Sequence, residues 1–327
     1  MIDLTSLLKN TKAYKTVKTD FLEGRLSHAY LVLCADKENL DDYLKGLAKV
    51  FFCEKGDACG NCRPCSLIEK GIFSDLVFLP KDGQTISAED VTALVQDTYI
   101  KPYEADKKVY ILSHGETMNA TCQNKLLKTL EEPPKNVHII IGTISEYPLL
   151  STIKSRVKKL EIPAFSNDLL IDALKGECSD LERLQDAVCI SDGTVGSALK
   201  YYHDENLISC MEFCIDLIVN MQSSAQVIDF ADKMLKLKCD FLDTLAVLEL
   251  YFRDMLLLSV NESEGFFNKK AIKKLQNAKG YTQGALTAIL ESIVGARKRL
   301  EANSSKNVVA EWLLFKILEE KYKWQKL

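Results

Sequence analysis

The sequence predicts an α/β region in its first half and an all-helical region in its second half. In the first half, four short apolar segments alternate with segments of helical periodicity, which is the pattern of a parallel sheet with helices on both faces. After about Pro163 we expect no further strand, because the apolar residues recur at helical spacing. With 327 residues the chain is long enough for about two or three domains.

The predicted strands are short, apolar and rich in β-branched and aromatic residues. They are residues 29–34, 75–79, 108–112 and 137–141. Between them we expect helices at about 40–52 and 119–132. A third helix is expected to begin after Ser87, because Asp90 stands three residues later and the pair forms a capping-box pattern.

The second half of the chain is expected to form short helices over 166–203 and longer amphipathic helices over 206–260 and 270–325. One apolar stripe in this region has helical spacing. It consists of Leu245, Leu248, Tyr251, Phe252 and Met255. Such a stripe indicates a helix face in the core rather than a cofactor pocket.

The composition excludes several classes of protein. A hydrophobic fraction of 47% with 27% charged residues is typical of globular proteins and excludes disordered or collagen-like chains. No apolar run approaches 18 residues and no secretory signal is expected, so the sequence predicts a cytoplasmic protein without a membrane span. The net charge of −4 argues against strong binding of nucleic acid by this chain alone.

Four of the eleven cysteines fall within thirteen residues, in the pattern C-x5-C-x2-C-x2-C. The four are Cys53, Cys59, Cys62 and Cys65. Reduced thiols at this spacing predict a closed structural Zn²⁺ site of four thiolates. An iron–sulfur cluster is the rival interpretation, and disulfides or coincidence are the others. Of the remaining seven, Cys34 ends the first strand, and we expect the other six to be small buried residues.

The segment after the first strand has the position of a phosphate-binding loop but not its residues. Such a loop needs glycines and a lysine, because backbone N–H groups must crowd the phosphates. Residues 34–42 contain no glycine but four acidic residues, which are Asp36, Glu38, Asp41 and Asp42. Ser113 and His114 follow the strand that would end in Mg²⁺-binding acids, and we expect His114 to be hydrogen-bonded or solvent-facing. The sequence therefore predicts no nucleotide hydrolysis by this chain alone.

Several motifs, taken together and in order, resemble bacterial clamp-loader AAA+ subunits. They are His28-Ala29-Tyr30-Leu31, the four-cysteine cluster, Lys108–Leu112, Leu126–Pro134 and Thr152-Ile153-Lys154-Ser155-Arg156. The resemblance implies a RecA-like AAA+ domain over 1–163 with a zinc module at 53–65, a small helical lid over 164–205 and a helical collar over 206–327. The collar would oligomerise with partner subunits.

The resemblance also implies roles for single residues. Cys53, Cys59, Cys62 and Cys65 match the family's zinc ligands. Residues 34–42 occupy the Walker A position, where Cys34, Asp36, Leu40 and Asp41 make the motif degenerate; Leu40 replaces the phosphate-binding lysine. Ser113 and His114 replace the Walker B acids. Thr143 falls near the first sensor, and Gly196 replaces the second-sensor arginine. No ATP is therefore expected in this subunit.

One charged position is retained. Ser155-Arg156-Val157 resembles the family's Ser-Arg-Cys motif, with Val157 in place of the cysteine. The resemblance implies that Arg156, with Ser155, is an arginine finger that acts in trans at a neighbour's ATP site. The alternative is that Arg156 pairs with a local carboxylate.

The implied function is that of a scaffolding clamp-loader subunit of the DNA polymerase III holoenzyme. Its partners would be gamma/tau ATPase subunits, the delta subunit, the beta sliding clamp and, through the complex, primed DNA. It would not be an enzyme by itself. Two alternatives remain open at this point: a divergent ATP-binding gamma/tau-like subunit, and a zinc-containing DNA-binding adaptor.

Overall fold

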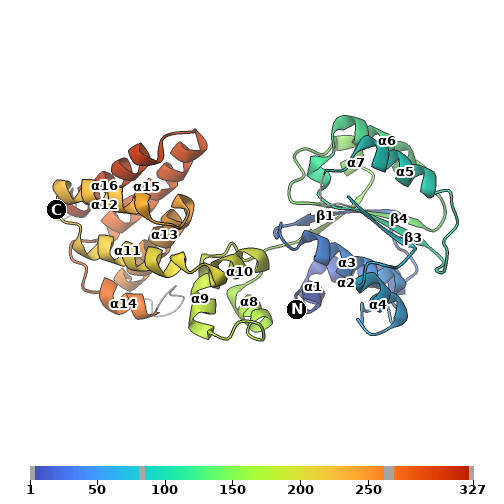
Figure 1. Ribbon diagram of the computed structural model, residues 1–327, viewed down its shortest axis with the longest axis horizontal. Helices are drawn as coiled ribbons and strands as arrows, with labels where there is room; N and C mark the ends of the chain where they lie inside the picture. The colour runs from blue at the N-terminus through green and yellow to red at the C-terminus, as the bar shows by residue number, and fades with distance from the viewer. Residues whose placement is uncertain (1–3, 81–84, 261–268, 324–327) are drawn as a thin grey trace. The chain divides into compact units, whose positions relative to one another are not determined.

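The computed structural model describes residues 4–80, 85–260 and 269–323. The chain forms two compact units, which we describe separately. The first unit consists of Met1–Ser179 and Asp192–Ser197, and the second of Asp180–Ser191 and Ala198–Leu327. Figure 1 shows the elements of each unit. The three-domain division remains a prediction.

The first unit is built on a five-stranded parallel sheet with strand order β2-β3-β4-β1-β5. Its strands are β1 (Ala29–Cys34), β2 (Leu76–Leu79), β3 (Lys108–Leu112), β4 (Val137–Thr143) and β5 (Lys158–Ile162). In the central pair, Tyr30 of β1 lies opposite Ile140 of β4. The predicted parallel α/β sheet and its first four strands are confirmed.

A fifth strand, β5, was not among the predicted ones, and it lies at the sheet edge beside β1. Its sequence is Lys-Lys-Leu-Glu-Ile, and only Leu160 and Ile162 are buried. Charged residues on an exposed edge strand discourage pairing with another chain. They also conceal the strand from a search for apolar runs, which explains why it was missed.

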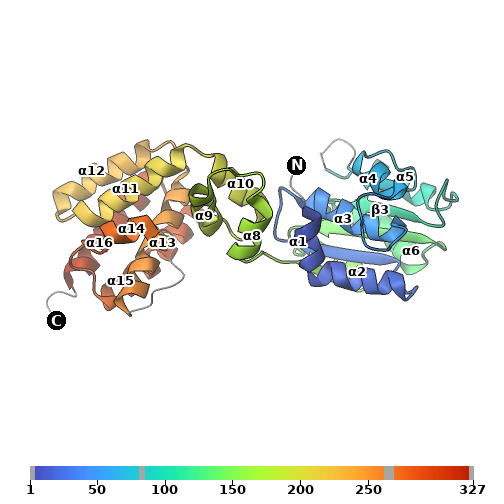
Figure 2. The same ribbon diagram turned by 90° about the horizontal axis from the view of Figure 1, so that it is seen from below.

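Helices cover both faces of the sheet. The helices of the first unit are α1 (Leu4–Asn10), α2 (Lys12–Leu22), α3 (Leu40–Phe52), α4 (Arg63–Glu69), α5 (Ala88–Asp97), α6 (Ala120–Glu131), α7 (Ser151–Lys154) and α8 (Asn167–Leu174), with a 3₁₀ turn at Gly115–Thr117. Figures 1 and 2 show α1 to α4 on one face and α5 to α7 on the other. The capping box before α5 is present: the Asp90 N–H donates to Ser87 Oγ at 3.0 Å, and the Ser87 N–H donates to the Asp90 carboxylate at 2.9 Å.

The second unit is helical throughout its described residues. It contains α9 (Leu181–Ile190), most of α10 (Val195–His203), α11 (Asn206–Asn220), α12 (Ser224–Lys236), α13 (Phe241–Ser259), α14 (Lys269–Leu275), α15 (Gln283–Glu301) and α16 (Lys306–Lys323). The stripe predicted on α13 lies in the core of this unit, with Leu245, Leu248, Tyr251 and Phe252 fully buried. The expected helical C-terminal region is confirmed.

The cysteines outside the cluster are buried with two exceptions. Cys122, Cys178, Cys210 and Cys214 are buried, whereas Cys189 and Cys239 are only partly covered. The expectation of core packing was therefore wrong for these two. Both lie beside the core cluster of the second unit rather than inside it.

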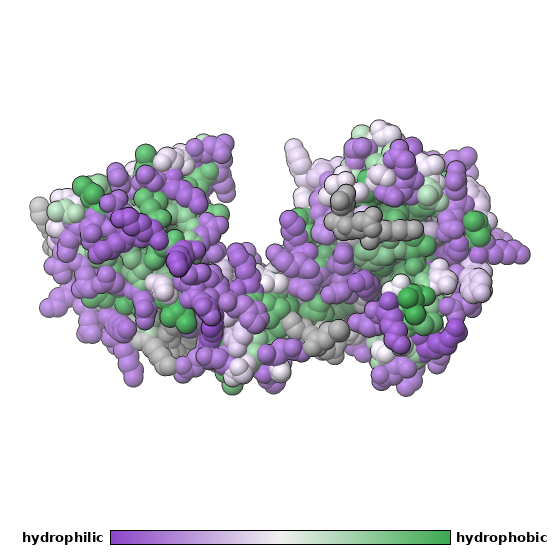
Figure 3. Space-filling view, viewed as in Figure 1, coloured by the Kyte–Doolittle hydropathy of each residue, from purple (hydrophilic) through white to green (hydrophobic). Residues whose placement is uncertain are grey.

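Charged and polar side chains dominate the face drawn in Figure 3, and apolar residues appear on it in small areas. Among the described residues, no helix combines the length and apolar character that crossing a membrane requires.

Candidate functional site

The four clustered cysteines converge as the spacing predicted. Their Sγ atoms all lie within 4.8 Å of one another. Cys53 follows α3, Cys62 caps the N-terminus of α4 and Cys65 lies in its first turn. Between them the backbone turns back through left-handed conformations at Ala58 (φ 43°) and Gly60 (φ 76°). A loop and a helix start therefore bring four sulfur atoms to one place.

Backbone N–H groups are directed at two sulfur atoms of the cluster and favour the thiolate at Cys59. The Cys59 N–H donates to Cys53 Sγ at 3.5 Å, and the Cys62 N–H donates to Cys59 Sγ at 3.4 Å. Backbone N–H groups of Asn61 and Cys62 lower the pKa of Cys59 to about 6, while burial raises the pKa of Cys65. Since thiolate is the metal-binding form, N–H donors directed at sulfur fit a metal–thiolate site.

The donor set fits zinc, because four cysteine sulfurs complete a tetrahedral shell and leave no position for a substrate. Cys53 and Cys65 are buried, and Cys59 and Cys62 are partly exposed. A bound Zn²⁺ would cross-link the loop to α4 and supply structural stability rather than chemistry. These four residues would hold it.

Asp57, which was not predicted from the sequence, connects the loop that carries the cysteines to the N-terminal helices. Asp57 accepts hydrogen bonds from Lys9 at 3.3 Å, Tyr14 Oη at 3.1 Å and Lys18 at 2.5 Å. The Lys18 ammonium and its two companions lower the pKa of Asp57 to about 2, so it is ionised at neutral pH. The cysteine loop is thus joined to α1 and α2.

In the segment after β1, Asp36 contacts the N-terminus of α10. The buried Asp36 carboxylate accepts the N–H of Val195 at 3.0 Å and that of Gly196 at 3.3 Å. It also accepts the N–H and side-chain amide of Asn39 at 3.0–3.3 Å. A helix N-terminus is a position that attracts anions, phosphates included. Here the chain itself supplies a carboxyl group, and burial raises the pKa of Asp36.

Gly196 shows how closely this region is filled. A Cβ added at Gly196 would lie 2.6 Å from the Cβ of Glu38 and 3.0 Å from Asp36 Oδ1. Leu40, at the start of α3, is fully buried and contributes no charge. Two acidic side chains and a buried leucine therefore fill the space between β1 and the start of α10.

Ser113 and His114 contact carboxylates instead of presenting any. Ser113 Oγ donates to Asp41 Oδ1, which joins the end of β3 to the first turn of α3. His114 Nδ1 lies 3.1 Å from Glu116, as expected for a hydrogen-bonded histidine. Glu116, which sequence reasoning missed, also accepts from Thr143 Oγ1 at 2.8 Å. Only its position two residues after His114 could have indicated it.

Arg156 follows α7 with its side chain about one-third exposed. Its Nη1 donates to the Thr152 carbonyl at 2.8 Å and to Ser155 Oγ at 3.2 Å. Its Nη2 lies 2.7 Å from Glu131 Oε1, at the end of α6. The expected alternative, a local carboxylate partner, is thus present, and the guanidinium remains accessible from solvent.

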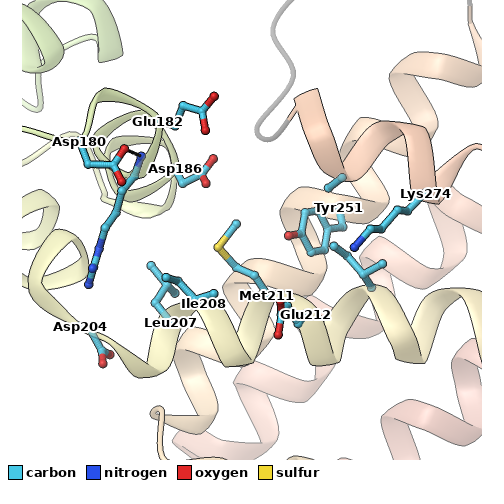
Figure 4. Close-up of a pocket in the computed structure, with 13 residues that line it drawn as sticks. Asp180, Glu182, Asp186, Asp204, Leu207, Ile208, Met211, Glu212, Tyr251 and Lys274 are labelled. Carbon is cyan, nitrogen blue, oxygen red and sulfur yellow. Dashed lines mark hydrogen bonds between the residues drawn. The ribbon is translucent and has the colours of Figure 1, made fainter.

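A pocket of about 440 Å³ lies in the second unit. None of the predicted site residues lines it, although Tyr251 of the predicted apolar stripe does. Figure 4 shows Glu182 and Asp186 on one wall, with Met211 and Tyr251 extending towards the space from α11 and α13. Asp180, Asp204 and Glu212 add further negative charge against Arg183 and Lys274. This excess of carboxylates disfavours a phosphate-bearing ligand.

Comparison with known proteins finds similarity to subunits of DNA polymerase III. Residues 9–166 match the family model described as "DNA polymerase III, delta subunit". The chain is 28% identical to DNA polymerase III subunit delta' of Bacillus subtilis over 94% of both chains. It is 33% identical to the tau subunit of Escherichia coli over 43% of this chain and 22% of that one.

Among solved structures, a gamma subunit-related protein of Thermotoga maritima matches over 95% of this chain and all of that one. The sequence identity is 19% and the TM-score is 0.43. The whole-length match to a delta' sequence and the family model agree with the motifs. The chain is similar to DNA polymerase III delta' subunits over nearly its whole length, and its N-terminal half matches the delta-subunit family model.

Proposed function

We propose that this delta'-like clamp-loader subunit binds no nucleotide itself and supplies Arg156 to an ATP site on a neighbouring subunit. The similarity to DNA polymerase III subunits supports a place for this chain in a DNA polymerase complex. The related gamma, tau and delta subunits indicate the class of partner in that complex.

Two features support the absence of nucleotide binding. The Asp36 carboxylate uses the N–H groups at the start of α10, which would otherwise be available to an anion. Asp41 and Ser113 bond to each other across the Walker positions, so neither is available for Mg²⁺ in this arrangement. A triphosphate would have to displace both contacts and approach several like charges at once.

The accessible guanidinium of Arg156 is the observation that carries the proposal. In ATP hydrolysis a water oxygen bonds to the γ-phosphorus while the bond to the ADP oxygen breaks, giving ADP, phosphate and a proton. Negative charge grows on the phosphoryl oxygens and on the leaving oxygen. A guanidinium placed there by a second subunit stabilises that charge, and it makes hydrolysis depend on assembly.

The rest of the chain has supporting roles in this proposal. Zn²⁺ at Cys53, Cys59, Cys62 and Cys65 stabilises the N-terminal part structurally. The C-terminal helices oligomerise with gamma/tau and delta subunits, and the complex as a whole places the beta sliding clamp on primed DNA. We propose a cytoplasmic setting for this work.

The test is reconstitution with candidate gamma/tau and delta subunits. We expect a stable heteropentamer whose ATPase responds to clamp and primed DNA. Arg156→Ala should slow hydrolysis at the affected site by at least about tenfold without dissociating the complex. Arg25→Ala is the matched control, because Arg25 is also exposed and pairs with a nearby glutamate. An unchanged ATPase in the Arg156→Ala complex would contradict the finger assignment.

Calorimetry on the isolated chain separates the two alternative functions from this one. Our proposal expects no heat on titration with Mg·ATP. Binding of Mg·ATP would favour the divergent ATPase, and tight, salt-sensitive DNA binding by the chain alone would favour the adaptor.

A further inference from the structure

We propose that Glu131 is a positioning residue for Arg156, fixing the guanidinium in the orientation from which it enters a neighbour's ATP site. This inference rests on the proposed function of Arg156. It concerns a residue on a different element, α6, whose side chain is oriented towards the arginine and not towards the sheet.

Three contacts hold the guanidinium, and they come from two segments. Nη1 donates to the Thr152 carbonyl at 2.8 Å and to Ser155 Oγ at 3.2 Å, both on the α7 segment. Nη2 lies 2.7 Å from Glu131 Oε1, at the C-terminal end of α6. The α7 contacts hold one nitrogen, and the Glu131 contact holds the other. Glu131 therefore sets the direction of the guanidinium plane.

Glu131 can serve as a fixed reference because the helix that carries it is firmly packed. Cys122 and Leu126 are fully buried against the sheet, and Leu130 is 2% exposed. The helix ends at Glu131, and Pro133 and Pro134 follow it. The Glu131 side chain is about half-exposed, so it reaches Arg156 from a rigid backbone at the molecular surface.

Orientation matters because an unrestrained arginine loses considerable rotamer freedom when it is immobilised. A side chain already held in one direction loses less on entering the partner's site, and misplacement of a group that contacts a phosphoryl centre is costly in rate. The guanidinium has more N–H groups than these three contacts use, so donors remain for phosphate oxygens.

The opposite role for the same contact would be a lock that neutralises Arg156 until a neighbour displaces Glu131. The exposure of both side chains argues against a strong lock, since surface pairs are weak and screened by water. The two roles predict opposite effects of removing Glu131. Loss of a positioning residue slows hydrolysis, whereas loss of a lock accelerates it.

The experiment measures ATPase kinetics of the reconstituted complex at saturating clamp and primed DNA. We expect Glu131→Ala to lower kcat about threefold with the KM for ATP unchanged, because only the presentation of Arg156 is altered. Glu131→Gln should keep most of the rate, since its amide oxygen still accepts from Nη2. Glu132→Ala is the matched control: it removes the same charge from the adjacent exposed residue and should leave the kinetics unchanged.

A double variant tests whether Glu131 acts through the arginine. In the Arg156→Ala background, Glu131→Ala should cause no further loss. An unchanged or raised kcat for Glu131→Ala alone, or a further loss in the double variant, would overturn the positioning role. If instead Arg156→Ala itself has no effect, it is the proposed function that fails, so the two failures are distinguishable.

Discussion

The Asp36 carboxylate accepts a hydrogen bond from the Val195 N–H at 3.0 Å, across a sequence separation of 159 residues. Asp36 follows the first strand, and Val195 begins α10. The bond therefore ties the segment at Asp192–Ser197 to the sheet of the first unit. A helix N-terminus attracts acidic groups, and Asp36 supplies one here from within the same unit.

Replacing Asp36 should destabilise the first unit. Asp36→Ala leaves the N–H groups of Asn39, Val195 and Gly196 without their acceptor. We expect the free energy of unfolding to fall by about 1–3 kcal/mol, measured by urea denaturation. Asp42→Ala is the control, because Asp42 makes only an exposed pair with Lys45 and should cost under about 0.5 kcal/mol. Equal losses in the two variants would contradict the role given to Asp36.

Gly196 should tolerate no side chain. A Cβ there lies 2.6 Å from Glu38 Cβ, so Gly196→Ala must shift one of the two segments. We expect a loss of about 1–3 kcal/mol in the free energy of unfolding, followed by circular dichroism. Gly176→Ala provides the comparison, since nothing lies within 4 Å of a Cβ at that position. The prediction fails if Gly196→Ala is as well tolerated as Gly176→Ala.

The cysteine cluster should hold zinc at about one ion per chain, in a form that depends on all four thiolates. Cys59→Ser should lose most of the zinc and lower the melting temperature, as elemental analysis and calorimetry would detect. Cys178→Ser removes a buried cysteine outside the cluster and should keep the metal. Zinc retained in full by Cys59→Ser, or absent from the wild-type chain, would count against the site.

Asp97 should give the first unit a pH-dependent stability. It accepts from Tyr110 Oη at 2.7 Å and from Lys108 at 3.0 Å. Burial alone would raise the pKa of Asp97, but the Tyr110 hydrogen bond and the Lys108 ammonium together hold it below its ordinary value. A lowered pKa in the folded chain means that the stabilisation is complete above the unfolded carboxyl's pKa of about 4 and is lost at lower pH.

Asp97→Asn should therefore lower the melting temperature at pH 7, by an amount that stays constant to about pH 5. The difference from wild type should shrink as the pH falls below about 4. Asp232→Asn, on an exposed position of α12, should change little at any pH. A difference that grows on acidification would have the wrong sign for this pair.

The sequence predicts most of the sheet, since buried parallel strands are apolar runs that stand out from their surroundings. Residues 29–34 and 108–112 match β1 and β3 at both ends. It does not predict β5, whose register is determined by pairing with β1 and whose composition resembles a loop. It does not predict α1 and α2 either, because their burial depends on packing against α3.

The candidate sites also contain residues that the sequence predicts and residues whose roles depend on the folded structure. The four cysteines are recognisable because ligand type and spacing are themselves the signal. Asp57, Glu116 and Glu131 carry no such signal, because their roles arise from groups that are distant in sequence or from turns within the fold. Glu131 could have been suspected only from its place in the Leu126–Pro134 motif.

The bonds from Asp57 to Lys9, Tyr14 and Lys18 have a thermodynamic consequence for the cysteine loop. If a metal orders that loop, it also fixes the position of the Asp57 carboxylate, which accepts hydrogen bonds from α1 and α2. Thermodynamic coupling is reciprocal. If metal binding stabilises α1 and α2, then folded α1 and α2 increase the affinity for the metal by the same free energy. Deletion of α1 and α2 would therefore lower the affinity of the loop for zinc, although all four cysteine ligands would be retained.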